Sequence, residues 1–220
     1  MATISSWAGD FALDQLADGE ELSLNLLHMD KETALSRLDD IYTEGFERCQ
    51  STFDCKGMYR SLSVVGKSDD AIELEDGVVF KSAQAARLLC HAEEVVLYAA
   101  TVHGYEEMLD ASGGDALEEM LCNAWGAGYS MSCNGLVKGM IVQAAQEQDL
   151  FVGRGWSPGE NDLDIGLQKT LLDAMDIAQI GVSAKGTMVR PIMTVCGFMG
   201  VSSDPVIKQD GADLPESTMN

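Results

Sequence analysis

Glu94-Val95-Val96-Leu97-Tyr98-Ala99-Ala100-Thr101-Val102 is an almost unbroken apolar run, and it decides the fold that we expect for this chain. A run of this length without polar alternation is typical of a strand that is buried on both faces of a sheet. His103-Gly104 ends the run. We therefore expect an interior strand here, with its end near Thr101 as a place where a site often opens.

The segments before this run mix helical and strand patterns. Apolar residues at three- and four-residue steps predict a helix that begins at Lys31, with Asp30 as its N-cap. Residues 59–65 alternate like a strand, and the Asp-Gly pair within residues 71–80 predicts a hairpin turn. Ser82 is a candidate cap for a short helix that follows.

The segments after the run continue this mixture. A long helical pattern covers residues 115–148, and its glycines favour a break or a kink. A glycine-rich loop is expected over residues 153–162, then a helix near 164–176 capped by Asp164, and an apolar strand near 187–201. Because the elements lack regular βαβ alternation, we predict an α+β fold: a single domain with a twisted, mostly antiparallel sheet flanked by helices. Residues 1–30 are expected to form an acidic arm or helix, 31–201 the domain, and 202–220 a polar, ragged tail.

Composition narrows the class of protein. The 220 residues carry a net charge of −22, and such acidity disfavours binding to nucleic acid or to an anionic membrane surface, although it can also serve solubility alone. No stretch approaches the roughly 20 apolar residues that span a bilayer, and the first residues do not resemble a signal peptide. We therefore expect a cytoplasmic protein.

The six cysteines, at positions 49, 55, 90, 122, 133 and 196, show no CxxC spacing. We interpret them as buried, reduced thiols rather than as disulfide partners or metal ligands. The three histidines have no metal-ligand spacing with one another, so no metal site is expected.

Three patches of this sequence resemble the activation domain of cobalamin-dependent methionine synthase and its small free-standing relatives. The first is residues 96–104, similar to a strand that ends in Ala-Thr-x-Gly. The second is Ser157-Pro158-Gly159, similar to the core of the family's Arg-x-x-Pro-Gly-Tyr loop. The third runs from Gln168-Lys169 through Ile180-Gly181-Val182 to residues 191–197, similar to the family's Pro-x-x-Ser-Val-Ser ending. The order and spacing of the patches extend the likeness over about residues 55–200.

The resemblance implies a function. Members of this family bind S-adenosylmethionine and present it to a cobalamin that a partner carries, so that a corrinoid-binding methyltransferase inactivated by oxidation is reduced and remethylated. The expected partners are that corrinoid protein and an external electron donor such as a flavodoxin or ferredoxin. Because the cofactors carry the chemistry, we expect no catalytic acid, base or nucleophile on this chain.

The expected ligand-binding residues follow from the chemistry of that ligand. Arg154 is the sole basic residue between Lys138 and Lys169, so it is the candidate for the ligand carboxylate. Around it, Gly155 and Gly159 permit close backbone approach, Trp156 offers a stacking surface and Glu160 a partner for the ammonium group. The remaining candidates are Ser157 and Pro158 in the turn and Tyr98 and Thr101 at the strand end. Each has a plainer alternative: a surface arginine, an ordinary turn, a buried anchor or core packing.

The chain also departs from the family pattern. Gly155 stands where the family has arginine, Glu160 stands where it has tyrosine, and Ser130 lies nearest the position of a helix glutamate. These departures keep open an alternative function: a non-catalytic module that docks a corrinoid protein or binds another small ligand on the same scaffold.

Overall fold

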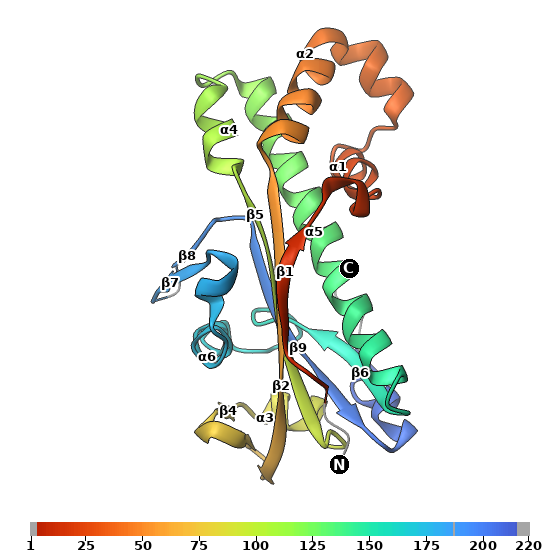
Figure 1. Ribbon diagram of the computed structural model, residues 1–220, viewed down its shortest axis with the longest axis vertical. Helices are drawn as coiled ribbons and strands as arrows, with labels where there is room; N and C mark the ends of the chain where they lie inside the picture. Colours follow the sequence, from red (N-terminus) through yellow and green to blue (C-terminus); the bar gives the residue numbers. More distant parts are fainter. Residues whose placement is uncertain (1–3, 187, 215–220) are drawn as a thin grey trace.

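The computed structural model describes residues 4–186 and 188–214 (Figure 1). Seven strands form one sheet, in the order β4-β3-β2-β5-β9-β6, and β1 also pairs with β2. Their bounds are β1 Trp7–Phe11, β2 Asp54–Lys67, β3 Ala71–Leu74, β4 Val79–Lys81, β5 Glu94–His103, β6 Phe151–Trp156 and β9 Thr194–Ser202. A separate hairpin joins β7 (Ser183–Lys185) to β8 (Met188–Arg190).

Strand β5 is the interior strand that its sequence predicts. It pairs with β2 along its whole length, from Asp54↔His103 to Ser63↔Glu94, and with β9 from Thr101↔Thr194 to Glu94↔Val201. Side chains 95–102 are at most 1% exposed. All the strand pairs described are antiparallel, so the predicted α+β fold with an antiparallel sheet is confirmed.

Helices cover both faces of the sheet (Figure 1). One face, which we call the α5 face, packs under α1 (Gly19–Leu26), α2 (Lys31–Thr52), α4 (Tyr105–Ala111) and α5 (Ala116–Gln146). The opposite face, which we call the α6 face, packs under α3 (Ala83–Leu88), α6 (Leu167–Ala174) and the 3-10 helices η3 (Ile177–Ile180) and η4 (Pro205–Gln209). Successive residues of a strand point to opposite faces, so Tyr98 belongs to the α5 face and Leu97 to the α6 face.

Several local predictions are confirmed. The Asp30 carboxylate accepts a hydrogen bond from the Thr33 amide at 2.7 Å at the start of α2, and Ser82 caps α3 through the Ala85 amide at 3.2 Å. Strands β3 and β4 form the predicted hairpin. These features depend on residues close together in sequence, which is why their pattern identified them.

Helix α5 corrects the expected break, because it runs for 31 residues without interruption. Two of its glycines, Gly126 and Gly128, allow close packing. A Cβ at Gly128 would lie 2.1 Å from the Oγ of Ser23, so α1 approaches the backbone of α5 directly. At Gly135 and Gly139 a Cβ would meet nothing within 4 Å.

Three other expectations differ from the structure. Residues 153–156 belong to strand β6 rather than to a loop, and β9 begins at Thr194 rather than near residue 187. Asp164 accepts a hydrogen bond from the Gly166 amide just before α6, but Gly166 rather than Asp164 is the N-cap. Residues 202–214 were expected to be ragged; instead they form η4 and a turn, with the Ile207 side chain fully buried. Residues 215–220 lie outside the described part of the chain.

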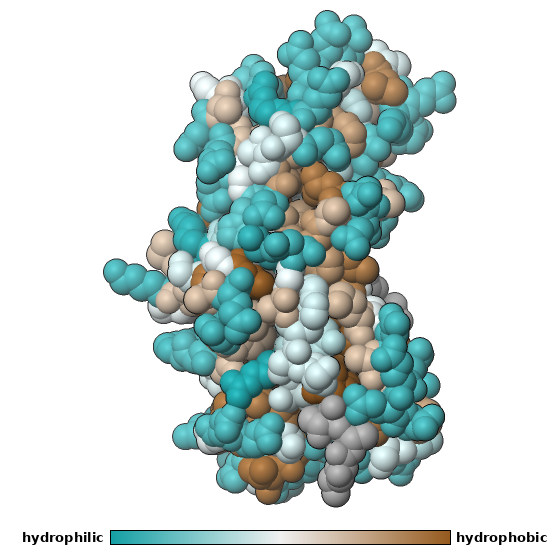
Figure 2. Space-filling model, viewed as in Figure 1, coloured by the Kyte–Doolittle hydropathy of each residue, from teal (hydrophilic) through white to brown (hydrophobic). Residues whose placement is uncertain are grey.

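The surface seen in Figure 2 is mostly hydrophilic, and the cysteines are mostly buried. On the face shown in Figure 2, hydrophilic side chains cover most of the surface and hydrophobic ones show as smaller groups between them. Across residues 4–186 and 188–214, no helix is both long and apolar enough to cross a bilayer. Five cysteines are buried and all six are free thiols, but Cys90 is exposed, which corrects the expectation that it is buried.

Candidate functional site

The candidate site begins where strand β6 ends. Strand β6 pairs with β9 from Phe151↔Ser202 to Trp156↔Phe198. Pro158 follows in the next turn and has no amide proton to donate to a further pair. Within the described residues, the β9 edge over 194–197 therefore has no partner in β6. The sheet is open at this edge.

A cleft of about 490 Å³ lies against this open edge. Helix α5 forms one wall, the turn after β6 and the start of α6 form another, and the connection into β9 forms the floor. The lining residues are Leu26, Ala127, Ser130, Met131, Ser157, Pro158, Ile165, Gln168, Ile192, Met193, Thr194, Val195 and Cys196. This volume falls within the range of about 300–1,000 Å³ that small-molecule sites occupy.

Ser130 is the most informative residue of the cleft. Its side chain is 3% exposed, and its Oγ has no hydrogen-bond partner among the described residues. A buried hydroxyl without a partner costs about 1–3 kcal/mol, so a ligand atom or a water in the cleft is the natural partner.

Thr101 supports the cleft from behind. Its Oγ1 lies 2.7 Å from the Oγ1 of Thr194, and the Thr194 hydroxyl donates to the Pro191 carbonyl at 2.7 Å. Because the Thr194 hydroxyl has one proton and donates it to the Pro191 carbonyl, the Thr101 hydroxyl must be the donor in its hydrogen bond with Thr194. Thr101 therefore fixes the floor of the cleft and does not line it.

Tyr98 also lies beneath the site, on the α5 face. Burial raises the pKa of Tyr98, and a hydrogen bond with Ser157 partly offsets that rise. A Cβ at Gly155 would lie 3.2 Å from the Tyr98 hydroxyl and 3.2 Å from the Cδ of Lys138. A side chain at position 155 would therefore require the Lys138 side chain or the Tyr98 hydroxyl to shift by a few tenths of an ångström. Burial lowers the pKa of Lys138, and the charge of Glu160 works against that shift.

Arg154 and Trp156 lie on the opposite face of β6, the α6 face. The Arg154 guanidinium donates to the carbonyls of Gly211 and Leu214 at 3.1 and 2.9 Å, and so holds the turn after η4. The Trp156 side chain is 2% exposed and packs in the core of the α6 face. These contacts place both side chains against the C-terminal turn.

The predicted site residues are therefore only partly brought together. Ser157 and Pro158 line the cleft, and Gly159 stabilises their turn with a φ of +91° and an amide that donates to the Leu163 carbonyl at 2.9 Å. Sequence reasoning missed Met131, Ile165 and Leu26. Gln168 and residues 192–196, which belong to the third family-like patch, also line the cleft.

A second hollow of about 330 Å³, lined in part by Phe151 and Lys208, contains none of the predicted residues. The cleft beside β9 is therefore the candidate site. Together with the fold, it defines an α+β domain in which a long helix packs on an antiparallel sheet and a mostly apolar cleft opens at the end of an edge strand.

Among solved structures, a similar one is the crystal structure of the MetH reactivation domain bound to AdoHcy. The two chains are 11% identical, the match covers 90% of this chain and 78% of that chain, and the TM-score is 0.65. At this level of identity the likeness establishes the fold, which is that of the reactivation domain. No protein-family model and no curated protein sequence matches the chain.

Proposed function

We propose that this protein binds S-adenosylmethionine in the cleft beside β9 and supports the reductive remethylation of a cobalamin that a partner carries, such as the corrinoid subunit of a split methionine synthase. The observation that carries the proposal is the buried, unpartnered Ser130 hydroxyl in a ligand-sized cleft. The scaffold adds support, because the MetH reactivation domain of the same fold was solved bound to AdoHcy.

The residues present fit the neutral parts of such a ligand. Met131, Ile165 and Met193 offer apolar surface for the adenine ring and the alkyl chain, while Ser130 and Gln168 offer a hydroxyl and an amide for ribose or ring nitrogens. The lining side chains described are formally neutral. The net charge of −22 creates a field that favours a cationic ligand over an anionic one.

The task of this chain is positioning. When bound, S-adenosylmethionine supplies an electrophilic methyl group, and no proton needs to be moved by the protein. The cleft wall must also be inert toward that methyl group. Burial raises the pKa of the Cys196 thiol to about 12, so it stays protonated and is a poor nucleophile.

The proposed role in reductive remethylation requires a partner that carries the cobalamin and a donor of electrons. We propose a corrinoid-binding methyltransferase protein that meets the open side of the cleft, with electrons from a flavodoxin or ferredoxin. A chain with a net charge of −22 is expected to bind through an electropositive surface on the partner, with an affinity that falls as salt rises.

Calorimetry with S-adenosylmethionine and S-adenosylhomocysteine tests the ligand. Ala127→Leu extends a side chain into the cleft from a half-buried position of α5 and should abolish binding. Ser130→Ala removes the unpartnered hydroxyl and should weaken binding by about 1 kcal/mol, or roughly fivefold. Gly135→Ala on the same helix, where a Cβ meets nothing within 4 Å, is the matched control and should bind like the unmodified chain.

Arg154→Ala separates two arrangements of the site. If the guanidinium stays on Gly211 and Leu214, the substitution leaves the affinity for S-adenosylmethionine unchanged. If Arg154 binds the ligand carboxylate, as the sequence led us to expect, the affinity falls by about 2 kcal/mol or more.

The alternative function is a non-catalytic module that docks a corrinoid protein or binds another small ligand. It is favoured by Gly155, where the family arginine is missing and the Lys138 side chain lies close by. Absence of S-adenosylmethionine binding at millimolar concentration, with corrinoid-protein docking intact, would establish this alternative and reject the first proposal.

A further inference from the structure

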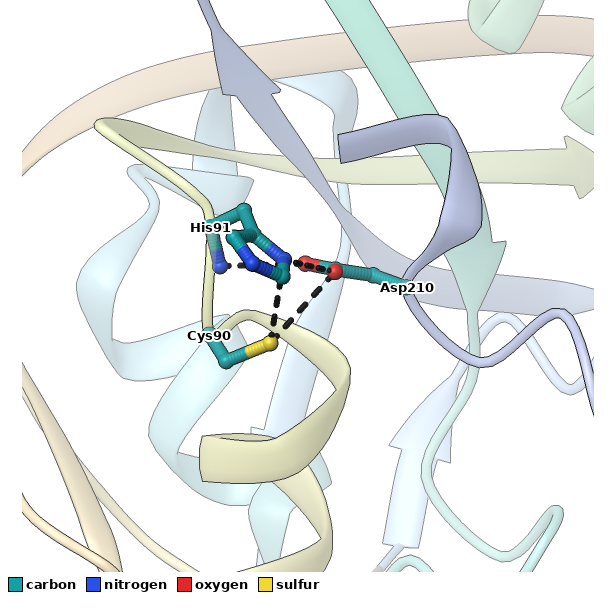
Figure 3. A group of neighbouring side chains, drawn as sticks. All are labelled: Cys90, His91 and Asp210. Carbon is teal, nitrogen blue, oxygen red and sulfur yellow. Dashed lines mark hydrogen bonds and ion pairs between the residues drawn. The ribbon is translucent and has the colours of Figure 1, made fainter. Parts of the chain in front are cut away.

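A second cluster of chemically reactive side chains lies away from the cleft. Cys90 and His91 follow α3, and Asp210 follows η4, 119 residues beyond His91 (Figure 3). The three side chains point toward one another. The Cys90 Sγ lies 3.2 Å from the His91 Nδ1 and 3.4 Å from an Asp210 oxygen, and that oxygen lies 2.5 Å from the His91 Nδ1.

The geometry differs from that of a catalytic triad. In a triad the imidazole uses one nitrogen for the nucleophile and the other for the carboxylate. Here the thiol and the carboxylate both meet the same nitrogen, Nδ1. The three potential donor atoms lie 2.5–3.4 Å from one another, close enough to surround one ion after small side-chain rotations.

The burial of the three groups suits a cation that enters from solvent. The Asp210 side chain is 3% exposed, so its carboxylate lies inside the protein, whereas the His91 side chain is 47% exposed and Cys90 is exposed. Buried carboxylates are stable when they are paired or bound to a metal. The open side gives an ion, and a water to complete its shell, a path to the site.

We propose that Cys90, His91 and Asp210 bind a divalent cation of the zinc class. Thiolate, imidazole and carboxylate are together the ligand types of Zn²⁺, and a thiolate disfavours Mg²⁺ and Ca²⁺. The ion takes the place of the thiol proton, which is released to solvent, and the imidazole binds through Nδ1 with its proton on Nε2. The net charge of −22 attracts cations to the surface.

The ion acts as a clip for the C-terminal turn. Lys67 of β2 already donates to the Cys90 carbonyl at 2.8 Å, so one side of the site is anchored to the sheet. The other side carries Gly211, whose carbonyl accepts from Arg154 and whose backbone packs against Trp156. None of the three ligands lines the cleft, so this inference does not depend on the proposed function.

Titration of the full chain with Co²⁺ tests the site, because a thiolate ligand gives a charge-transfer absorption band that carboxylate and imidazole do not. We expect one Co²⁺ per chain with this band, displacement by Zn²⁺, and slower proteolysis after η4 when Zn²⁺ is present. Cys90→Ser should abolish the band, and His91→Gln should weaken binding roughly tenfold or more, since each removes one of three donors.

Asp213→Asn is the matched control, because it removes an exposed carboxylate from the same turn, paired with Arg87 rather than with the site. It should bind like the unmodified chain. The site is rejected if Co²⁺ binds without the thiolate band, if Cys90→Ser binds as tightly as the unmodified chain, or if no Co²⁺ binds. Near-ultraviolet circular dichroism of each variant checks that the fold is retained.

Discussion

The two faces of the sheet are covered in different ways. On the α5 face a helix of 31 residues, α5, runs along the sheet with α1, α2 and α4 beside it, while the α6 face is covered by short pieces, α3, α6, η3 and η4. The long cover packs against β2, β5 and β9 through one continuous row of buried side chains. Within this divided cover, the C-terminal turn packs against Trp156 at Gly211.

This difference explains where the cleft lies. Strand β6 stops at Trp156, and beyond it neither cover closes the β9 edge, so α5 and α6 become the two walls of an opening. Helix α5 provides the wall that carries Ser130, and α6 provides the wall that carries Gln168. Helix α5 and the start of α6 therefore set the position of the cleft.

Replacing one buried tryptophan on each face has the largest expected effect. Trp156→Ala and Trp125→Ala each remove a side chain that is 2% exposed, so each should lower the free energy of unfolding by about 3–5 kcal/mol. The measurement is chemical denaturation followed by circular dichroism.

The two variants should differ in proteolysis. Trp156 packs against Gly211, so Trp156→Ala should expose the turn after η4 to protease. Trp125 packs against Gly45 in α2, so Trp125→Ala should leave that turn protected. Equal cleavage of that turn in both variants would contradict a divided cover on the α6 face.

Alkaline pH should loosen the α5 face before the α6 face. Four buried thiols lie on the α5 face (Cys49, Cys55, Cys122 and Cys133), and Cys196 lies on the other. Burial raises the pKa of Cys55 to about 12 and that of Cys122 to about 11, above the value of about 8.5 in unfolded chains. A raised pKa gives stability that is complete below about pH 8.5 and is lost as the pH rises toward the folded value, at about 1.4 kcal/mol per pH unit for each thiol.

Cys55→Ala should therefore reduce the slope of the free energy of unfolding against pH, between about pH 9 and 11, by about 1.4 kcal/mol per unit. Hydrogen exchange should show the amides of α5 losing protection first. Earlier loss in α6 would mean that the thiols do not control the alkaline response.

Gly135→Ala has the smallest expected effect and the opposite sign. Its Cβ meets nothing within 4 Å on an exposed side of α5, so it should raise the free energy of unfolding by about 0.5–1 kcal/mol through helix propensity. Gly128→Ala provides the contrast, because its Cβ would lie 2.1 Å from the Oγ of Ser23 and should destabilise the chain. Thermal unfolding measures both, and equal effects would contradict the close approach of α1 to α5.

The sequence predicted the elements whose signals are local. The run 94–102, the Asp-Gly hairpin and the caps at Asp30 and Ser82 each depend on a few neighbouring residues, and all are confirmed. The glycines of strand β6 lower its strand propensity and predict a loop, whereas its pairing with β9 joins residues far apart in sequence. The sequence does not predict the turn after η4 for a similar reason. Arg154 and Trp156, which hold this turn, lie more than fifty positions earlier in the sequence.

The site was predictable to the same extent. Ser157 and Pro158 form the predicted turn and line the cleft, but a loop interpretation could not separate Gly155 from Arg154 and Trp156. In a strand, alternate residues face opposite sides, and this alternation sends Trp156 and Gly155 to different faces. The convergence of Cys90, His91 and Asp210 carried no spacing signal, because its third member lies 119 residues from the second.

The notch at Gly128 has a consequence for access to the cleft. Helix α1 rests in this notch through Ser23, and Leu26, one turn further along α1, lies at the rim of the cleft with 46% of its side chain exposed. The size of the residue at position 128 therefore sets how far Leu26 stands from the opposite wall. A change on the hidden side of α5 would widen or narrow the entrance without touching any group that a bound molecule contacts.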